Sequence, residues 1–130
     1  MGLKQRIWNA RLSGFFRHVN CIGTAFYISG VLPHDSCIHP SAAQLYLDDL
    51  DVLNEPEEGC ILALRNRKSS DLDHMAVVIV TNPILIVHRE DTNRPIKNNV
   101  NLEEYLNYIY INYQTAYEKT YYAPKPLSWR

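Results

Sequence analysis

Cys21, His74 and His88 are the side chains in this sequence best suited to chemistry, because a cysteine and two histidines can support thiol-based hydrolysis. Cys21 begins the apolar stretch 21–32, which ends before Pro33 and predicts a buried helix. The first amides of a helix point outward and carry partial positive charge, so they favour a thiolate and can also bind an oxyanion. A nucleophile placed there still needs a base, and the base needs a group that orients it.

The two histidines bracket a predicted β-hairpin. His74 opens the first of two apolar, β-branched runs, His88 closes the second, and Thr81-Asn82-Pro83 lies between them. A two-residue turn before Pro83 would require an amide hydrogen that proline lacks, so we expect a three-residue turn at 81–83. A turn with an odd number of residues places both histidines on one face of the sheet, whereas a turn with an even number would place them on opposite faces. We therefore predict that one histidine is the base and that the other orients it through a hydrogen bond.

The elements that must position these residues follow from apolar periodicity and capping signals. In chain order we expect an amphipathic helix or turn at 3–16, a buried helix at 21–32, a helix from the capping box Ser41–Gln44 to about Leu50, strands at 60–64, 74–80 and 84–88, and a helix at about 102–112 capped by Asn101 and Glu104. The Tyr-rich tail, with Pro124, Pro126 and Trp129, is expected to pack across the surface. This segregation predicts an α+β fold, with N-terminal helices packed on a small antiparallel sheet.

The composition predicts one domain over residues 1–130. An apolar fraction of 46% and a charged fraction of 21% are typical of a folded protein with one core. The formal net charge is −1 and no basic stripe is apparent, so neither nucleic acid nor an anionic membrane is expected as the main partner. Three cysteines at irregular spacing argue against a disulfide framework and favour a reducing compartment or a free reactive thiol.

Nothing in the sequence predicts a leader or a membrane anchor. Charges interrupt residues 1–18, no apolar run approaches about 18 residues, and Arg6 breaks the myristoylation pattern. We therefore expect a chain that is cytoplasmic as synthesised, and delivery out of the cell without a signal peptide stays open. The sequence does not fix the oligomeric state.

Three short motifs resemble those of the NlpC/P60 cysteine peptidases, a family with a compact papain-like fold. The family's Asp-Cys-Ser-Gly-Phe is similar to residues 20–24, Asn-Cys-Ile-Gly-Thr; its Pro-Gly-Asp-Leu to residues 58–61, Glu-Gly-Cys-Ile; and its His-Val-Gly-Ile-Tyr to residues 74–78, His-Met-Ala-Val-Val. The family's third position, often histidine, falls on His88. The resemblance covers about residues 18–90, with His74 53 positions after Cys21 and His88 14 positions later.

The resemblance implies a thiol hydrolase without a cofactor or metal. Cys21 would attack an amide or ester carbonyl and form a thioester, His74 would move the protons, His88 would hold His74, and water would release the product. The substrate would be a peptide or a small amide or ester, and many relatives cut cell-wall peptides. Asn20 and Ile22 replace the family's Asp and Ser beside the nucleophile, which leaves the substrate open.

Two other functions stay open. The set His18, Cys21, His34, Cys37 and His39 has finger-like spacing and could form a zinc-stapled interaction module, although the spacer is apolar and a chain of this length needs no staple. Alternatively, a papain-like fold can lose its chemistry and serve as a binding domain. A lone buried cysteine is also commonly inert core, and Cys60 is interpreted in that way.

Overall fold

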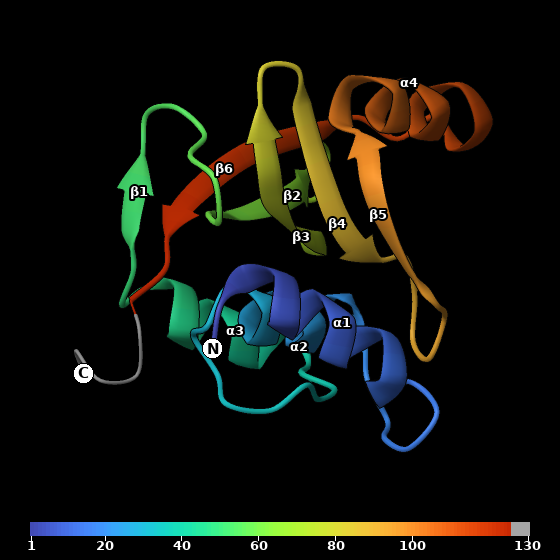
Figure 1. Ribbon diagram of the computed structural model, residues 1–130. Coiled ribbons are helices and arrows are strands. Elements are labelled where there is room, and N and C mark those ends of the chain that lie inside the picture. Colours follow the sequence, from blue (N-terminus) through green and yellow to red (C-terminus); the bar gives the residue numbers. More distant parts are fainter. Residues whose placement is uncertain (126–130) are drawn as a thin grey trace.

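The computed structural model describes residues 1–125, in which helices and strands combine into an α+β fold (Figure 1). The helices are α1 (Leu3–Ser13), α2 (Cys21–Ile28), α3 (Pro40–Leu47) and α4 (Leu102–Tyr113). The strands are β1 (Asp51–Leu53), β2 (Ile61–Asn66), β3 (Leu72–Thr81), β4 (Ile84–Arg89), β5 (Ile96–Asn101) and β6 (Tyr117–Ala123). They form one antiparallel sheet in the order β1-β6-β2-β3-β4-β5, which confirms the predicted α+β class.

Helices pack on both faces of the sheet. In Figure 1, α1, α2 and α3 lie together on one side, whereas α4 lies at the opposite end beside β5. Alternate side chains of β3 enter two different cores: Met75 and Val77 pack with α1–α3, and Ala76 and Val78 pack with α4. His74 shares the parity of Ala76, so its side chain lies on the α4 face. No helix within residues 1–125 is long and apolar enough to cross a bilayer.

The helix that starts at Cys21 is shorter than the apolar stretch that predicted it. α2 ends at Ile28 rather than extending over 21–32, because Gly30 adopts a left-handed φ of 86°. The N–H of Val31 then donates to the carbonyl oxygen of Phe26 at 2.9 Å, which closes the helix in a Schellman-type turn. The apolar residues after the turn continue into the core without helical structure.

The hairpin that carries both histidines turns differently from the prediction. Thr81 pairs with Ile84, so the turn holds two residues, Asn82 and Pro83, and their peptide bond is cis. A two-residue turn alone would place the histidines on opposite faces. However, a β-bulge leaves Ile79 unpaired and adds one residue to β3, which restores the shared parity. The predicted turn length is wrong, and the bulge supplies the odd residue that the turn lacks.

Two capping predictions have opposite outcomes. Pro40 occupies the first helical position of α3, so the N-cap is His39 and not Ser41. The Nδ1 of His39 accepts from the Ser41 amide at 3.2 Å. The predicted cap of α4 is confirmed, because the Asn101 side chain accepts from the Glu104 amide at 3.1 Å.

Three strands that the sequence did not predict complete the sheet. β1 and β5 are its two edges, and β6 lies between β1 and β2. The segment expected to pack across the surface is therefore an interior strand, in which Tyr121 and Tyr122 are buried. Pro126 and Trp129, also part of that prediction, lie outside the described residues.

Candidate active site

Cys21 is the first residue of α2 and is partly exposed. Three backbone N–H groups act on its sulfur: its own, that of Ile22 and that of Met75 on β3. Because Met75 directly follows His74, the sulfur lies beside the peptide group that joins these two residues. Burial raises the pKa of the Cys21 thiol, the three amides oppose that effect, and the Asp91 carboxylate adds a smaller increase.

The start of α2 is fixed by Asn20 and Gly23. The Asn20 side chain is the N-cap, and its Oδ1 accepts from the Gly23 amide at 2.9 Å and from the Ile38 amide at 3.1 Å. A Cβ on Gly23 would lie 1.7 Å from the backbone oxygen of Ser36, so only glycine allows that segment to pass so close. A neutral amide thus caps the helix without adding a negative charge beside the thiol.

This cap leaves two amides at the helix N-terminus available. Asn20 accepts from the amides of Gly23 and Thr24, whereas the N–H groups of Cys21 and Ile22 act on the Cys21 sulfur. Such N–H groups point out of the helix and carry the positive end of its dipole. An oxyanion formed at the Cys21 sulfur would meet these two donors.

The structure brings His74 and His88 together. The Nε2 of His74 lies 2.6 Å from the Nδ1 of His88, which is a hydrogen-bond distance, and the ring planes meet at 84°. Tyr105 of α4 packs against both rings, with centroid distances of 5.8 Å to His74 and 4.9 Å to His88. Both imidazoles are buried, at 4% and 2% exposure.

The shared hydrogen bond leaves one free nitrogen on each ring. The Nδ1 of His74 has no hydrogen-bond partner within residues 1–125, and no hydrogen bond there joins it to the Cys21 sulfur, which packs against the core on the α1–α3 face. Among the described residues, the Nε2 of His88 is buried without a partner. If His74 Nδ1 is to accept a proton from Cys21, the proton of neutral His74 must be on Nε2, which then donates to His88 Nδ1. The proton of neutral His88 is in that case on the Nε2 of His88.

Burial keeps both histidines neutral near neutral pH. It lowers the pKa of His74 to about 3, with a further decrease from the neighbouring His88. It lowers the pKa of His88 to about 4, where Glu90 acts to raise it and Lys97 to lower it. The resting site therefore holds a thiol and two neutral imidazoles, not a thiolate–imidazolium pair.

A buried arginine ties the histidine strand to the cysteine helix. Arg89, directly after His88, donates through Nε to Thr24 Oγ1 at 2.9 Å and through Nη2 to the Ala10 carbonyl oxygen at 2.8 Å. Its Nη2 also lies 3.2 Å from Asp35 Oδ2, and both side chains are at most 2% exposed. Thr24 closes the network by donating to Asp35 Oδ1 at 2.7 Å. Because Thr24 lies one turn after the nucleophile position, this network sets how β4 and α2 lie relative to each other.

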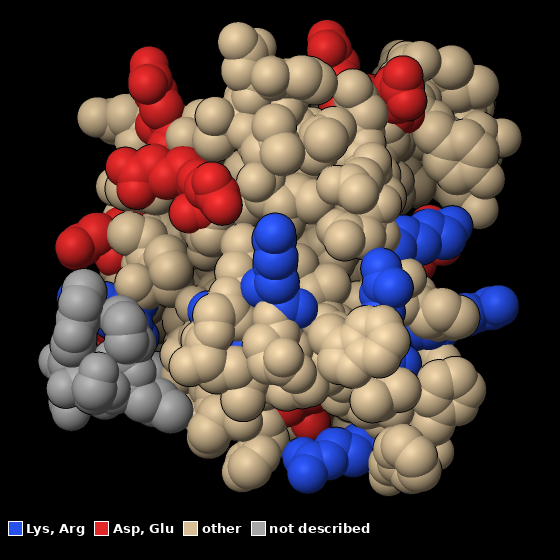
Figure 2. All heavy atoms as spheres, viewed as in Figure 1, with Lys and Arg blue, Asp and Glu red and all other residues tan. Residues whose placement is uncertain are grey.

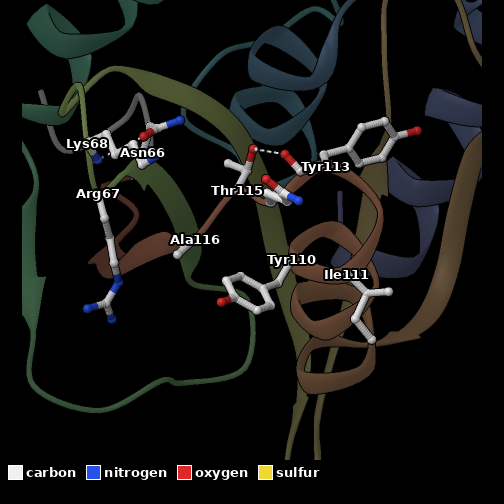
Figure 3. A pocket seen from close by; sticks show the side chains of 9 residues that line it. Asn66, Arg67, Lys68, Tyr110, Ile111, Tyr113, Thr115 and Ala116 are labelled. Carbon is white, nitrogen blue, oxygen red and sulfur yellow. Dashed lines mark hydrogen bonds between the residues drawn. The ribbon is translucent and has the colours of Figure 1, made fainter.

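Two surface hollows share Tyr113, and neither is lined by Cys21, His74 or His88. The larger, of about 770 Å³, lies between the β2–β3 turn and the end of α4; Figure 3 shows Arg67 and Tyr110 on opposite sides, with Ala116 between them. Ala116 precedes Tyr117, whose pKa is raised by burial and by nearby negative charge, including that of the Cys21 thiolate.

The smaller hollow, of about 460 Å³, is lined by Tyr105 together with Glu90 and Lys97. Burial raises the pKa of Tyr105, and the charge of the Cys21 thiolate adds to that effect. Tyr105 therefore lines the smaller hollow, and Tyr117 directly follows Ala116, which lines the larger one.

The zinc-site alternative has no support from the geometry. Within residues 1–125 no group of three or more His, Cys, Asp or Glu side chains could hold a metal ion. His18 is instead hydrogen-bonded to Asn93 at 3.1 Å, and His39 caps α3. Cys60 is buried in the core of the α4 face, in keeping with a packing role.

Sequence reasoning missed three residues of this region. Tyr105 lies one turn into the capped helix α4, and no local signal shows that this turn faces the histidines. Arg89 could have been noticed as a cation that directly continues an apolar strand, a position where burial requires a partner. Its partner Asp35 lies 54 positions earlier, so the pairing depends on the tertiary fold.

Comparisons of the chain with protein-family models, with curated proteins and with solved structures found no match.

Proposed function

We propose that this chain is a papain-like thiol hydrolase, similar to the NlpC/P60 cysteine peptidases, which cleaves an amide or ester bond through a thioester on Cys21. The main support is the 2.6 Å contact between His74 Nε2 and His88 Nδ1, on the same strand as the Met75 amide that acts on the Cys21 sulfur. A nucleophile, a base and an orienting group are the three parts that covalent acyl transfer needs.

Acylation would begin as the Cys21 sulfur attacks the substrate carbonyl carbon and its thiol proton passes to His74 Nδ1. The pKa of His74 is about 3 and that of the thiol is raised, so the proton moves as the sulfur–carbon bond forms and not beforehand. The amides of Cys21 and Ile22 would stabilise the oxyanion. Collapse of the tetrahedral intermediate expels the amine or alcohol, which takes the proton from His74.

Deacylation would reuse the same groups. His74 Nδ1 takes a proton from water, the resulting hydroxide attacks the thioester carbonyl, and the sulfur leaves as the carboxylic acid forms. The proton on His74 returns to the sulfur, which restores the resting site. Throughout, His88 accepts the Nε2–H bond of His74 and keeps the Nδ1 lone pair directed at the reacting atoms.

The substrate class that fits best is a peptide or another amide or ester with extended groups on both sides of the cleaved bond. Two surface hollows bordered by α4 offer tyrosines together with the cations Arg67, Lys68 and Lys97. Cell-wall-type peptides are one member of this class. The resemblance of residues 18–90 to the NlpC/P60 motifs adds to this proposal.

The proposal is tested by a hydrolysis screen with p-nitrophenyl esters, acyl-amino-acid anilides and short peptides. We expect turnover of at least one class by the wild type and loss of turnover in Cys21→Ala. Cys37→Ala, which removes an exposed thiol, is the matched control and should keep the activity. Activity that survives Cys21→Ala would contradict the proposal. A folded wild type without turnover or acyl-Cys21 would favour an inactive papain-like binding domain.

A further inference from the structure

α1 carries two apolar stripes, and the fold buries only one. Its inner face places Ile7 and Ala10 in the core. The outer face exposes Trp8 at 55% and Leu12 at 46%, although the outer face of a helix on a globular domain is normally polar. Trp8 and Leu12 are four residues apart and therefore lie on the same side of the helix.

The turn after α1 extends this exposed surface. Phe15 and Phe16 are 81% and 83% exposed, which is unusual for two adjacent aromatic side chains. The turn is held in place by Asn93, whose Nδ2 donates to the carbonyl oxygens of Gly14 at 3.2 Å and Arg17 at 2.8 Å. The phenylalanines are thus presented by a hydrogen-bonded turn. We call Trp8, Leu12, Phe15 and Phe16 the aromatic patch.

Cations border the aromatic patch. Lys4, Arg11 and Arg17 are exposed, and Lys4 and Arg11 share a surface hollow with Trp8. Residues 1–34 contain no Asp or Glu, so the 14 acidic residues of the chain all follow them. In Figure 2 most of the blue side chains lie over the lower half of the molecule, where α1 lies, and most of the red ones over the upper half. The formal net charge of −1 therefore conceals a strong asymmetry.

We propose that the aromatic patch and its cations bind the surface of an anionic lipid bilayer. Trp and Phe side chains partition into the headgroup region of a bilayer, and Lys and Arg beside them are attracted by anionic headgroups. The patch lies on the surface of a folded helix and turn, so α1 would lie in the plane of the interface. This inference departs from the expectation drawn from net charge, and it does not depend on the proposed hydrolase activity.

The test is co-sedimentation of the full chain with phosphatidylcholine vesicles, with and without phosphatidylglycerol. We expect binding to the vesicles that contain phosphatidylglycerol, weaker binding as salt is raised, and little binding to neutral vesicles. Each cation removed in Lys4→Gln, Arg11→Gln and Arg17→Gln should weaken binding about fivefold. Phe15→Ser/Phe16→Ser should also release the protein, whereas Tyr110→Ser/Ile111→Ser, which alters similarly exposed residues on α4, should not.

A second readout is the fluorescence of Trp8 in a Trp129→Phe background, where Trp8 is the only tryptophan. A blue shift on adding vesicles that contain phosphatidylglycerol, and quenching by brominated lipid, would place Trp8 in the headgroup region. The inference is overturned if the folded wild type does not bind these vesicles or binds neutral vesicles equally well. It is also overturned if the α4 control loses as much binding as the patch variants, or if the patch instead mediates a dimer that Phe15→Ser/Phe16→Ser dissolves.

Discussion

At the scale of single residues, His88 acts on the chemistry only through His74. Within residues 1–125, its Nδ1 is the one partner of His74 Nε2, and its own Nε2 is buried without a partner. An unsatisfied buried nitrogen is unfavourable by about 1–3 kcal/mol, so its retention here points to a role in the site. We interpret His88 as a positioning residue that selects the tautomer and orientation of the base.

Replacing His88 tests that role. His88→Ala leaves the Nε2–H of His74 unpaired, and we expect acylation of Cys21 by p-nitrophenyl acetate to slow by about 10–100-fold, the kinetic equivalent of about 1–3 kcal/mol. His88→Asn offers an amide oxygen as an alternative acceptor and should recover part of the rate. Equal rates in the Ala and Asn variants, with both folded, would argue that His88 only fills space.

The buried histidines also predict how stability depends on pH. Their pKa values of about 3 and about 4 in the folded state lie below the ordinary value of 6.5, so below about pH 6.5 the unfolded chain binds more protons than the folded one. The free energy of unfolding should therefore fall as pH decreases from about 6.5 towards 4. Each histidine contributes up to about 1.4 kcal/mol per pH unit.

Urea unfolding between pH 7 and pH 4.5 checks this slope. A His74→Gln/His88→Gln variant should show a flatter dependence than the wild type, while His34→Gln, which removes an exposed histidine, serves as the matched control. A wild-type slope unchanged by the double substitution would mean that the site histidines are not the groups that titrate.

At the scale of elements, the position of Cys21 depends on two features that fix α2. The loop through Ser36 passes so close to Gly23 that no side chain fits between them, and Arg89 joins β4 to α1, to α2 and to Asp35. Both features lie away from the sulfur itself. They set the approach of the helix N-terminus to the strand that carries His74.

Gly23→Ala tests the close approach. Its Cβ would stand 1.7 Å from the Ser36 oxygen, so backbone must move, and we expect a loss of at least about 3 kcal/mol in the free energy of unfolding. Gly2→Ala is the steric control, because nothing lies within 4 Å of its Cβ position, and alanine at this N-cap should lower the free energy of unfolding by only about 1 kcal/mol. Thermal or urea unfolding of both variants gives the comparison. Similar stability in the two would show that the loop yields easily.

A double-substitution cycle tests the buried ion pair. Arg89→Met leaves Asp35 as an unpaired buried charge and should destabilise the fold by about 3–5 kcal/mol. Arg89→Met/Asp35→Leu removes both charges and should be destabilised by less than the sum of the single changes. Lys97→Met breaks the exposed pair with Glu90 and should have an effect below about 1 kcal/mol. Additive effects at Arg89 and Asp35 would contradict their direct coupling.

At the scale of the whole molecule, the sequence could predict the apolar elements but not how they assemble. The strands with continuous apolar runs, β2, β3 and β4, and the capped helix α4 were predicted because burial imposes their pattern. β1 and β5 are short or polar edge strands, and β6 begins with one tyrosine followed by Glu118, Lys119 and Thr120, so none carries the signal of a buried strand. Their places in the sheet arise from pairing between distant segments.

In the candidate site, too, some features were predicted from the sequence and others depend on the tertiary fold. The pairing of His74 with His88 was predicted from parity along one hairpin, yet the odd residue comes from the bulge at Ile79 and not from the turn. The contacts of Tyr105 and the network of Arg89 connect residues far apart in the chain, and no local pattern could have predicted them. The approach of Cys21 to the strand of His74 likewise depends on how α2 packs on the sheet.

The central claim is that Cys21 is a nucleophile assisted by His74, and the most direct measurement is the rate of its acylation by p-nitrophenyl acetate at pH 7. Peptide mass spectrometry gives that rate alongside the rate at the exposed Cys37 of the same chain. Because burial raises the pKa of the Cys21 thiol, Cys21 should be slower than Cys37 unless a base assists it. We predict that Cys21 is faster and that His74→Ala slows it by about 100-fold or more without affecting Cys37. The account would be contradicted if Cys21 were acylated no faster than Cys37 and if His74→Ala left the rate at Cys21 unchanged.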